Sequence, residues 1–151
     1  MFLKEKYEDG NFVKMKARLV ADGWMQDRLV YPDHSSPTMK TKSVMTCLKL
    51  AAVKGWSLTK IDITSAYLCA DIGRDDEVFM ILDRTMSNLC KGWLLEVKEY
   101  FREDGKLVVK LDKALYSLIQ SAKLWYQELS GFLLSKGLKV CPSDPCVFSR
   151  G

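Results

Sequence analysis

Residues 58–68 read LTKIDITSAYL and place one carboxylate, Asp62, between two β-branched apolar residues, Ile61 and Ile63. Aspartate is depleted in β-strands, yet this stretch otherwise has the composition of a strand. A carboxylate that loses its hydration needs a partner. By residue type alone, a cap or an ion-pair partner is the commoner role and a functional site is the alternative. The partner of Asp62 therefore decides what this stretch does.

The overall composition is that of a globular domain or a piece of one. The chain has 151 residues, of which 48% are hydrophobic, enough to build a core. No apolar run approaches the length that spans a bilayer, and the charged N-terminus does not resemble a signal peptide. We therefore expect no membrane insertion and an intracellular protein, in the cytoplasm or the nucleus, that is not secreted.

The five cysteines are odd in number and form no CxxC pair, and the chain holds a single histidine. This pattern predicts neither a disulfide framework nor a zinc site, so we expect buried free thiols. Charge is uneven: residues 1–60 carry 11 Lys and Arg against 6 Asp and Glu, whereas residues 61–110 carry 7 against 10. A basic part beside an acidic part can hold polyanions next to a metal, although an ordinary solvated surface is the commoner meaning.

The first predicted element is a β-hairpin that turns at Asp9-Gly10, a strong turn signal. In its second strand, Lys14, Lys16 and Arg18 alternate with apolar residues, so the strand period of two places all three cations on one face. A solvated hairpin face is the alternative to a binding surface.

Two helices are predicted from apolar residues that recur every three or four positions. The first should run from Ser43 as N-cap to Gly55, and the second should occupy residues 114–137. Strands are expected at residues 56–63, 77–82 and 146–148, and a further hairpin at Asp104-Gly105. Hairpins mixed with helices, without regular βαβ units, favour the α+β class.

Five stretches taken together resemble the reverse transcriptase domain of copia-type retrotransposons. They are KARLVADGWMQ (16–26), DITSAYL (62–68), EVFM (77–80), VKLDKALYSLIQSAKLWY (109–126) and SDPCVF (143–148). The resemblance runs from about Phe2 to Phe148. It implies part of a right-hand polymerase fold. Residues 1–56 would form a fingers hairpin, loop and helix, and residues 57–151 part of the palm with a returning fingers segment.

The resemblance implies RNA-directed DNA polymerase activity, with dNTPs and an RNA or DNA template-primer as partners. It makes Asp62 one of the catalytic carboxylates that hold two Mg²⁺ ions, with the backbone carbonyl of Ile63 as a further ligand. Two such ions stabilise the attacking and leaving oxygens of the in-line displacement, and Mg²⁺ prefers oxygen ligands. Tyr67 matches the ring that excludes a 2′-hydroxyl, with a core aromatic as the alternative.

The same resemblance assigns nucleotide binding to two further groups of residues. Lys16 and Arg18 match basic positions that contact the triphosphate or the template backbone, and the sequence does not distinguish which contacts which. Tyr116, Ser117 and Gln120 match a segment near the nucleotide and the template base. Most relatives have glycine at position 117, so serine departs from the family pattern there.

An aromatic-x-Asp-Asp hairpin that supplies the remaining carboxylates is expected soon after Phe148, and the sequence to Gly151 does not contain it. Asp75 and Asp76 match an acidic surface loop instead of this pair. We therefore expect a truncated domain that is inactive by itself. The alternatives are a nucleic-acid-binding module without catalysis and a remnant that binds only protein.

Overall fold

The computed structural model describes residues 2–31, 35–73, 76–93 and 95–150. Its strands pair into three separate two-stranded antiparallel sheets, β1–β2, β3–β4 and β5–β6. Mixed helices and small antiparallel sheets agree with the α+β class. In chain order the elements are β1 (Phe2–Glu8), β2 (Asn11–Arg18), η1 (Gly23–Met25), α1 (Thr41–Lys54), η2 (Ala66–Cys69), β3 (Phe79–Ile81), α2 (Arg84–Trp93), η3 (Leu95–Tyr100), β4 (Val108–Lys110), α3 (Ser121–Ser135), β5 (Lys139–Cys141) and β6 (Asp144–Ser149).

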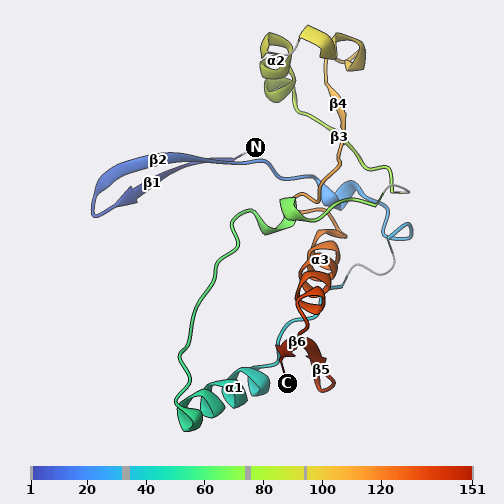
Figure 1. Cartoon of the computed structure of the whole chain (residues 1–151). Coiled ribbons are helices and arrows are strands. Elements are labelled where there is room, and N and C mark those ends of the chain that lie inside the picture. Colours follow the sequence, from blue (N-terminus) through green and yellow to red (C-terminus); the bar gives the residue numbers. More distant parts are fainter. Residues whose placement is uncertain (1, 32–34, 74–75, 94, 151) are drawn as a thin grey trace.

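The predicted N-terminal hairpin is confirmed, with β1 and β2 joined at Asp9 and Gly10. Both turn residues have positive φ, 51° and 80°, which is the requirement of the tight turn that matches the strand twist. Figure 1 shows this hairpin as a long ribbon that projects away from the rest of the chain. The base of the hairpin, near Arg18, lies beside the rest of the molecule.

The buried core is small and lies where three chain segments meet. Its members are Ala21, Ile72, Val78, Leu115 and Leu118. The backbone N–H of Ala21 donates to the carbonyl of Tyr116 at 2.8 Å, and that of Ile72 donates to the carbonyl of Asp112 at 2.9 Å. These bonds join the segment after β2 and the segment after η2 to the turn that precedes α3.

The predicted strand over residues 56–63 is wrong, because the structure assigns no strand there. Figure 1 shows this stretch as an extended connection between α1 and η2. Ile61 is 80% exposed and Ile63 42% exposed, so neither anchors a buried face. A strand is stabilised by a hydrogen-bonded neighbour, and the described residues supply no neighbouring strand to this segment.

The first helix is present but begins before the residue predicted as its N-cap. Helix α1 has Lys40 at its N-cap, which places Ser43 inside the first turn. Its C-terminus is as predicted, since Gly55 adopts a left-handed conformation with φ of 64°. The apolar stripe predicted for this helix does not form a core: only Ala51 is buried, while Val44 is 36% and Leu48 43% exposed.

The second helix is shorter than predicted and the second hairpin is only partly formed. Helix α3 begins at Ser121, because Ser117 has φ of 74° and breaks the helical path before it. Gly105 turns the chain with φ of 75°, and a single bridge joins Phe101 to Leu107. Residues 95–100 before that bridge form a 3-10 helix, so the full hairpin prediction is wrong there.

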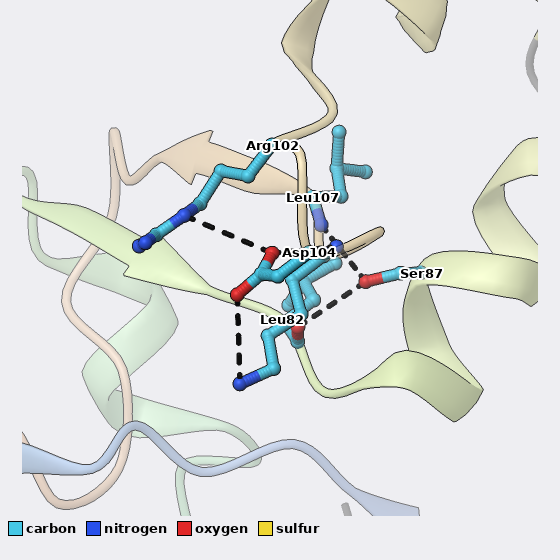
Figure 2. A network of polar contacts seen from close by, with 6 residues as sticks. Leu82, Ser87, Arg102, Asp104 and Leu107 are labelled. Atoms are coloured by element: carbon cyan, nitrogen blue, oxygen red, sulfur yellow. Dashed lines mark hydrogen bonds and ion pairs between the residues drawn. The ribbon is translucent and has the colours of Figure 1, made fainter.

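Helix α2 was not predicted, and a buried serine fixes it to the β3–β4 unit. Ser87 Oγ donates to the carbonyl of Leu82 at 3.2 Å and accepts from the N–H of Leu107 at 2.9 Å. Figure 2 shows Ser87 between these two backbone groups, next to the exposed ion pairs that Asp104 makes. Ser87 is fully buried, so it satisfies two backbone groups that water does not reach.

All five cysteines are free, as expected, but they are not buried: Cys47 and Cys69 are exposed and the other three are half-buried. Among the described residues, none of the helices combines the length and the hydrophobicity that crossing a membrane requires.

Candidate functional site

A cleft of about 440 Å³ lies between the base of β2 and the segment that precedes η2. Five of the eight predicted site residues line it. They are Lys16, Arg18, Asp62, Ile63 and Tyr116. Because residues 16–18 and 62–63 are far apart in sequence, this arrangement is a result of the fold.

The two cations reach the cleft because they share one face at the base of β2. Arg18 is the last residue of this strand and Lys16 lies two positions before it, so both side chains point to the same side. Within the described parts of the chain, neither residue makes an ion pair with a carboxylate. Both cations are therefore available to an anionic ligand.

Asp62 enters the same cleft from the opposite wall. It is exposed and lies in an irregular segment that turns into η2 at Ser65, whose φ is 55°. The N–H of Leu68 donates to the carbonyl of Ser65 at 2.9 Å and closes this turn. The cleft therefore combines two cations with one carboxylate and the backbone of Ile63.

The aromatic residues lie side by side at one end of this arrangement. The rings of Tyr67 and Tyr116 have centroids 4.8 Å apart and planes at 62°, an edge-to-face contact. Tyr116 lines the cleft, whereas Tyr67 is half-buried and does not line it. Tyr67 thus supports Tyr116 in this conformation.

Ser117 and Gln120 also do not line the cleft. Ser117 is exposed and adopts the left-handed conformation, which is costly for serine and readily accessible to glycine. Gln120 is 5% exposed. Its Oε1 accepts from Gln26 Nε2 at 3.1 Å, while its own Nε2 is buried without a partner among the described residues.

Gly23 and Gln26 contact the turn that directly follows the cleft residue Tyr116, and they were not singled out from the sequence. A Cβ at Gly23 would lie 1.8 Å from the carbonyl oxygen of Ser117, so only glycine permits this approach. Gln26 Oε1 accepts from the N–H of Ile119 at 2.9 Å. Both residues belong to the stretch KARLVADGWMQ, which therefore carried a signal for packing as well as for charge.

A further carboxylate that sequence reasoning did not single out, Asp144, is structural. It is fully buried and accepts from the N–H of Lys40 at 2.9 Å and from that of Cys146 at 3.0 Å. A hydrogen bond from the side chain of Ser43, followed by these backbone bonds, lowers the pKa of Asp144. It thus caps α1 from a residue more than 100 positions away in the chain.

The described residues do not make up a complete Mg²⁺ site. Asp62 is the only carboxylate among the residues that line the cleft. Within the described ranges, no three His, Cys, Asp or Glu side chains lie close enough together to hold a metal ion. Asp75 lies outside the described residues, and Asp76 is exposed and belongs to no such group. Asp62 and the Ile63 carbonyl can supply two oxygen ligands, and the remaining positions of an octahedral Mg²⁺ would be filled by water and substrate phosphates.

A second cavity, of about 450 Å³, lies between the segment after β2 and strand β3. Its walls are mainly apolar, with Met25, Met80 and Met86 among the lining residues. None of the predicted site residues lines it, although Leu19 lines both this cavity and the cleft.

Comparisons with known proteins agree with the sequence motifs. The chain is 32% identical over 153 residues to the retrovirus-related Pol polyprotein from transposon TNT 1-94 of Nicotiana tabacum, covering 99% of this chain and 10% of that protein. It is 31% identical over 154 residues to the corresponding polyprotein from transposon RE1 of Arabidopsis thaliana, covering 98% and 9%. It is 31% identical over 156 residues to the transposon Ty1-H Gag-Pol polyprotein of Saccharomyces cerevisiae, covering 99% and 7%.

The chain thus spans a tenth or less of these relatives' length. No solved structure matches it significantly. The family model described as reverse transcriptase (RNA-dependent DNA polymerase) matches residues 1–151. The resemblance to copia-type retrotransposons is confirmed, and the chain belongs to the reverse transcriptase family of retrotransposon Pol polyproteins.

Proposed function

We propose that this chain supplies the nucleotide-facing part of an RNA-directed DNA polymerase. The observation that supports this most is the cleft in which Lys16 and Arg18 face Asp62 and Ile63. In this role the cations bind phosphate oxygens, Arg18 through its planar guanidinium and Lys16 as a point charge. Residues 1–56 act as fingers and residues 57–151 as part of the palm with a returning fingers segment.

The proposed role of Asp62 is to contribute one carboxylate to a pair of Mg²⁺ ions. Because it stands alone in the cleft, we expect the 151-residue chain by itself not to extend a primer. The test is a primer-extension assay with Mg²⁺, dNTPs and an RNA template annealed to a DNA primer. Extension by the unaltered chain that disappears in Asp62→Ala would refute the proposed inactivity.

Binding of a nucleotide is tested separately from catalysis. Calorimetric titration with dTTP in Mg²⁺ buffer should show binding that Lys16→Gln/Arg18→Gln weakens by at least tenfold, since each charged hydrogen bond contributes about 1.5–3 kcal/mol. The control Lys42→Gln/Lys49→Gln removes the same charge from exposed positions on α1. Equal weakening by both variants would show that net charge, and not the cleft, binds the triphosphate.

A second candidate function is nucleic-acid binding without catalysis, which the unpaired cations of β2 favour. It predicts that Lys16→Ala/Arg18→Ala weakens binding of a template strand, whereas Asp62→Ala changes it little. In the polymerase role, Asp62→Ala also reduces the Mg²⁺-dependent part of dTTP binding. Comparing the two variants with both ligands distinguishes the two functions.

A further inference from the structure

The turn that carries Tyr116 is joined at both of its ends to the segment that follows β2. At one end, the N–H of Ala21 donates to the carbonyl of Tyr116 at 2.8 Å. At the other end, the half-buried side chain of Gln26 bonds to residues 119 and 120, which lie more than 90 positions away in the chain. Because β2 carries the cations of the cleft, this junction sets where the cations and Tyr116 lie relative to one another.

The backbone determines which way the side-chain amide of Gln26 faces. Its Oε1 accepts from the N–H of Ile119 at 2.9 Å. A backbone N–H can only donate, so the amide oxygen lies on that side and the amide nitrogen lies on the other. There, Gln26 Nε2 donates to Gln120 Oε1 at 3.1 Å. The Gln26 amide therefore has a single orientation that satisfies both of its neighbours.

Gln26 in turn determines the orientation of the Gln120 amide. Because a donor faces it, Gln120 presents its oxygen, and its Nε2 is left buried without a partner among the described residues. An unpaired buried donor costs free energy. Stability alone would favour a group at position 26 that accepts from both neighbours. The pair of amides thus holds the turn at a cost in stability, which is typical of functional sites.

The turn that these amides hold forms part of the cleft wall. Tyr116 lines the cleft, and its ring meets that of Tyr67 edge to face, with centroids 4.8 Å apart. The next residue, Ser117, has φ of 74°, a conformation that is costly for serine. A turn with a costly backbone conformation persists only when contacts from its surroundings hold it. Gln26 supplies two such contacts.

We propose that Gln26 is a positioning residue for the cleft, whose amide holds the turn so that the Tyr116 ring stays in the cleft wall. Gln26 itself does not line the cleft, so it acts through the turn and not by touching a ligand. The inference rests on the proposed function and deepens it, because it names a residue that maintains the shape of the proposed nucleotide cleft. If the turn is released, the apparent nucleotide affinity falls with the fraction of molecules that keep the cleft formed.

The first test observes the Tyr116 ring and needs no nucleotide. The whole chain is labelled with 3-fluorotyrosine, and Tyr116→Phe assigns the fluorine signal of Tyr116 in the NMR spectrum. Gln26→Leu removes both side-chain bonds to the turn. The signal should then move toward the position of free fluorotyrosine, because the ring leaves its contact with Tyr67. Gln127→Leu, the same change at an exposed position of α3, should leave the signal in place.

Rescue by Gln26→Glu distinguishes the two bonds from the mere bulk of the side chain. A carboxylate accepts from Ile119 as the amide does, and Gln120 can rotate its amide to donate to it. The Tyr116 signal should therefore stay close to that of the unaltered chain. All spectra are recorded well below the thermal midpoint of each variant. If Gln26→Leu does not fold, Gln26→Asn replaces it, because its side chain is one methylene too short to make both bonds.

Calorimetric titration with dTTP then relates the turn to binding. Gln26→Leu should weaken dTTP binding by about fivefold or more, as the fraction of molecules with a formed cleft falls. Gln127→Leu should leave the affinity unchanged. If neither the unaltered chain nor any variant bound dTTP while the fluorine shift held, the nucleotide site would be refuted and the positioning role of Gln26 would stand.

An unmoved Tyr116 signal in Gln26→Leu would overturn the proposal, and so would an equal movement in Gln127→Leu. A movement in Gln26→Glu as large as that in Gln26→Leu would also overturn it, because the two bonds would then not be what holds the ring. The same conclusion would follow if the unaltered chain and Gln26→Leu bound dTTP equally well.

Discussion

At the scale of single residues, close backbone contact at Gly23 holds the cleft together. One hydrogen on the Gly23 Cα takes the place of a side chain and points toward the Ser117 carbonyl, where a Cβ would lie 1.8 Å from the oxygen. Both partners are backbone atoms, so neither can move aside by changing a rotamer. The segment that carries Lys16 and Arg18 depends on this contact to reach the turn before α3.

Gly23→Ala should therefore destabilise the protein by about 1–3 kcal/mol or more, the cost of overpacking. Gly131→Ala is the matched control, because a Cβ at that position in α3 meets nothing within 4 Å. Replacing glycine by alanine inside a helix should stabilise it by roughly 0.5–1 kcal/mol. Urea unfolding shows whether each variant raises or lowers the free energy of unfolding. Equal changes in the two variants would show that the contact at Gly23 is not tight.

Through Asp144, the stability of the fold depends on pH in the acid range. Its pKa is lowered in the folded state by bonds from Ser43, Lys40 and Cys146, so the folded protein binds this proton less readily than the unfolded chain. The stabilisation is complete above the ordinary aspartate pKa of about 4 and is lost as pH falls through the lower folded value.

Asp144→Asn should lower the thermal midpoint by several degrees at neutral pH. On acidification, its thermal midpoint should fall less than that of the unaltered chain. Thermal unfolding between neutral pH and about pH 3 measures both effects. Asp112→Asn, which changes an exposed carboxylate, serves as control. If Asp144→Asn and the unaltered chain lost stability in parallel on acidification, this carboxylate would not be the acid-sensitive group.

At the scale of elements, Ser87 is the residue through which α2 and the β3–β4 unit are joined. Ser87→Ala would leave the buried N–H of Leu107 without its acceptor, which should cost about 1–3 kcal/mol. Ser135→Ala removes an exposed serine hydroxyl at the end of α3 and should cost much less. Chemical denaturation of the two variants compares them, and equal losses would contradict a specific role for Ser87.

Elements with strong local signals could be predicted from the sequence. Asp9-Gly10 specifies a turn by its own backbone preferences, and Gly55 ends α1 for the same reason. The strand over residues 56–63 was predicted from its composition, but a strand also needs a neighbour. Helix α2 is not apparent from its sequence, RTMSNLCKGW, because Thr, Ser, Asn and Gly are interspersed among its helix formers. Its tertiary contact through Ser87 is not visible in the sequence either.

In the candidate site too, local sequence patterns predict some features, whereas others depend on long-range contacts. Alternation along β2 placed Lys16 and Arg18 on one face, and the motif containing Asp62 identified the other wall of the cleft. The pairing of Lys16 with Lys4 of β1 depends on register, and the burial of Gln120 depends on Gln26. The cap of α1 by Asp144 joins residues that local patterns cannot relate. Long-range contacts of this kind account for what the sequence did not reveal.

At the scale of the whole molecule, the chain is open. Its accessible surface is 12072 Å², whereas a compact monomer of 17.3 kDa exposes about 7,800 Å². Figure 1 shows the hairpin, α1 and the α2 unit extending from the region around α3. Apolar side chains such as Trp56 and Leu58 are more than 60% exposed, so the surface is suited to further association.

This openness predicts a low dependence of unfolding free energy on denaturant. The unfolded chain exposes about 25,000 Å², so unfolding exposes about three-quarters of the area that a compact domain of this length would. Because the urea m-value scales with that area, it should also be about three-quarters of the usual value. An m-value typical of a compact 151-residue domain would show that the chain is compact in solution.

If the chain serves as proposed, a nucleotide binds in the cleft between the base of β2 and Asp62. Photo-crosslinking with an azido-dUTP, followed by peptide mapping, tests it most directly, with excess dTTP as competitor. We expect competable labelling confined to peptides that contain residues 16–19, 62–68 or 115–116. Competable labelling confined to α1, α2 or the cavity beside β3 would contradict it.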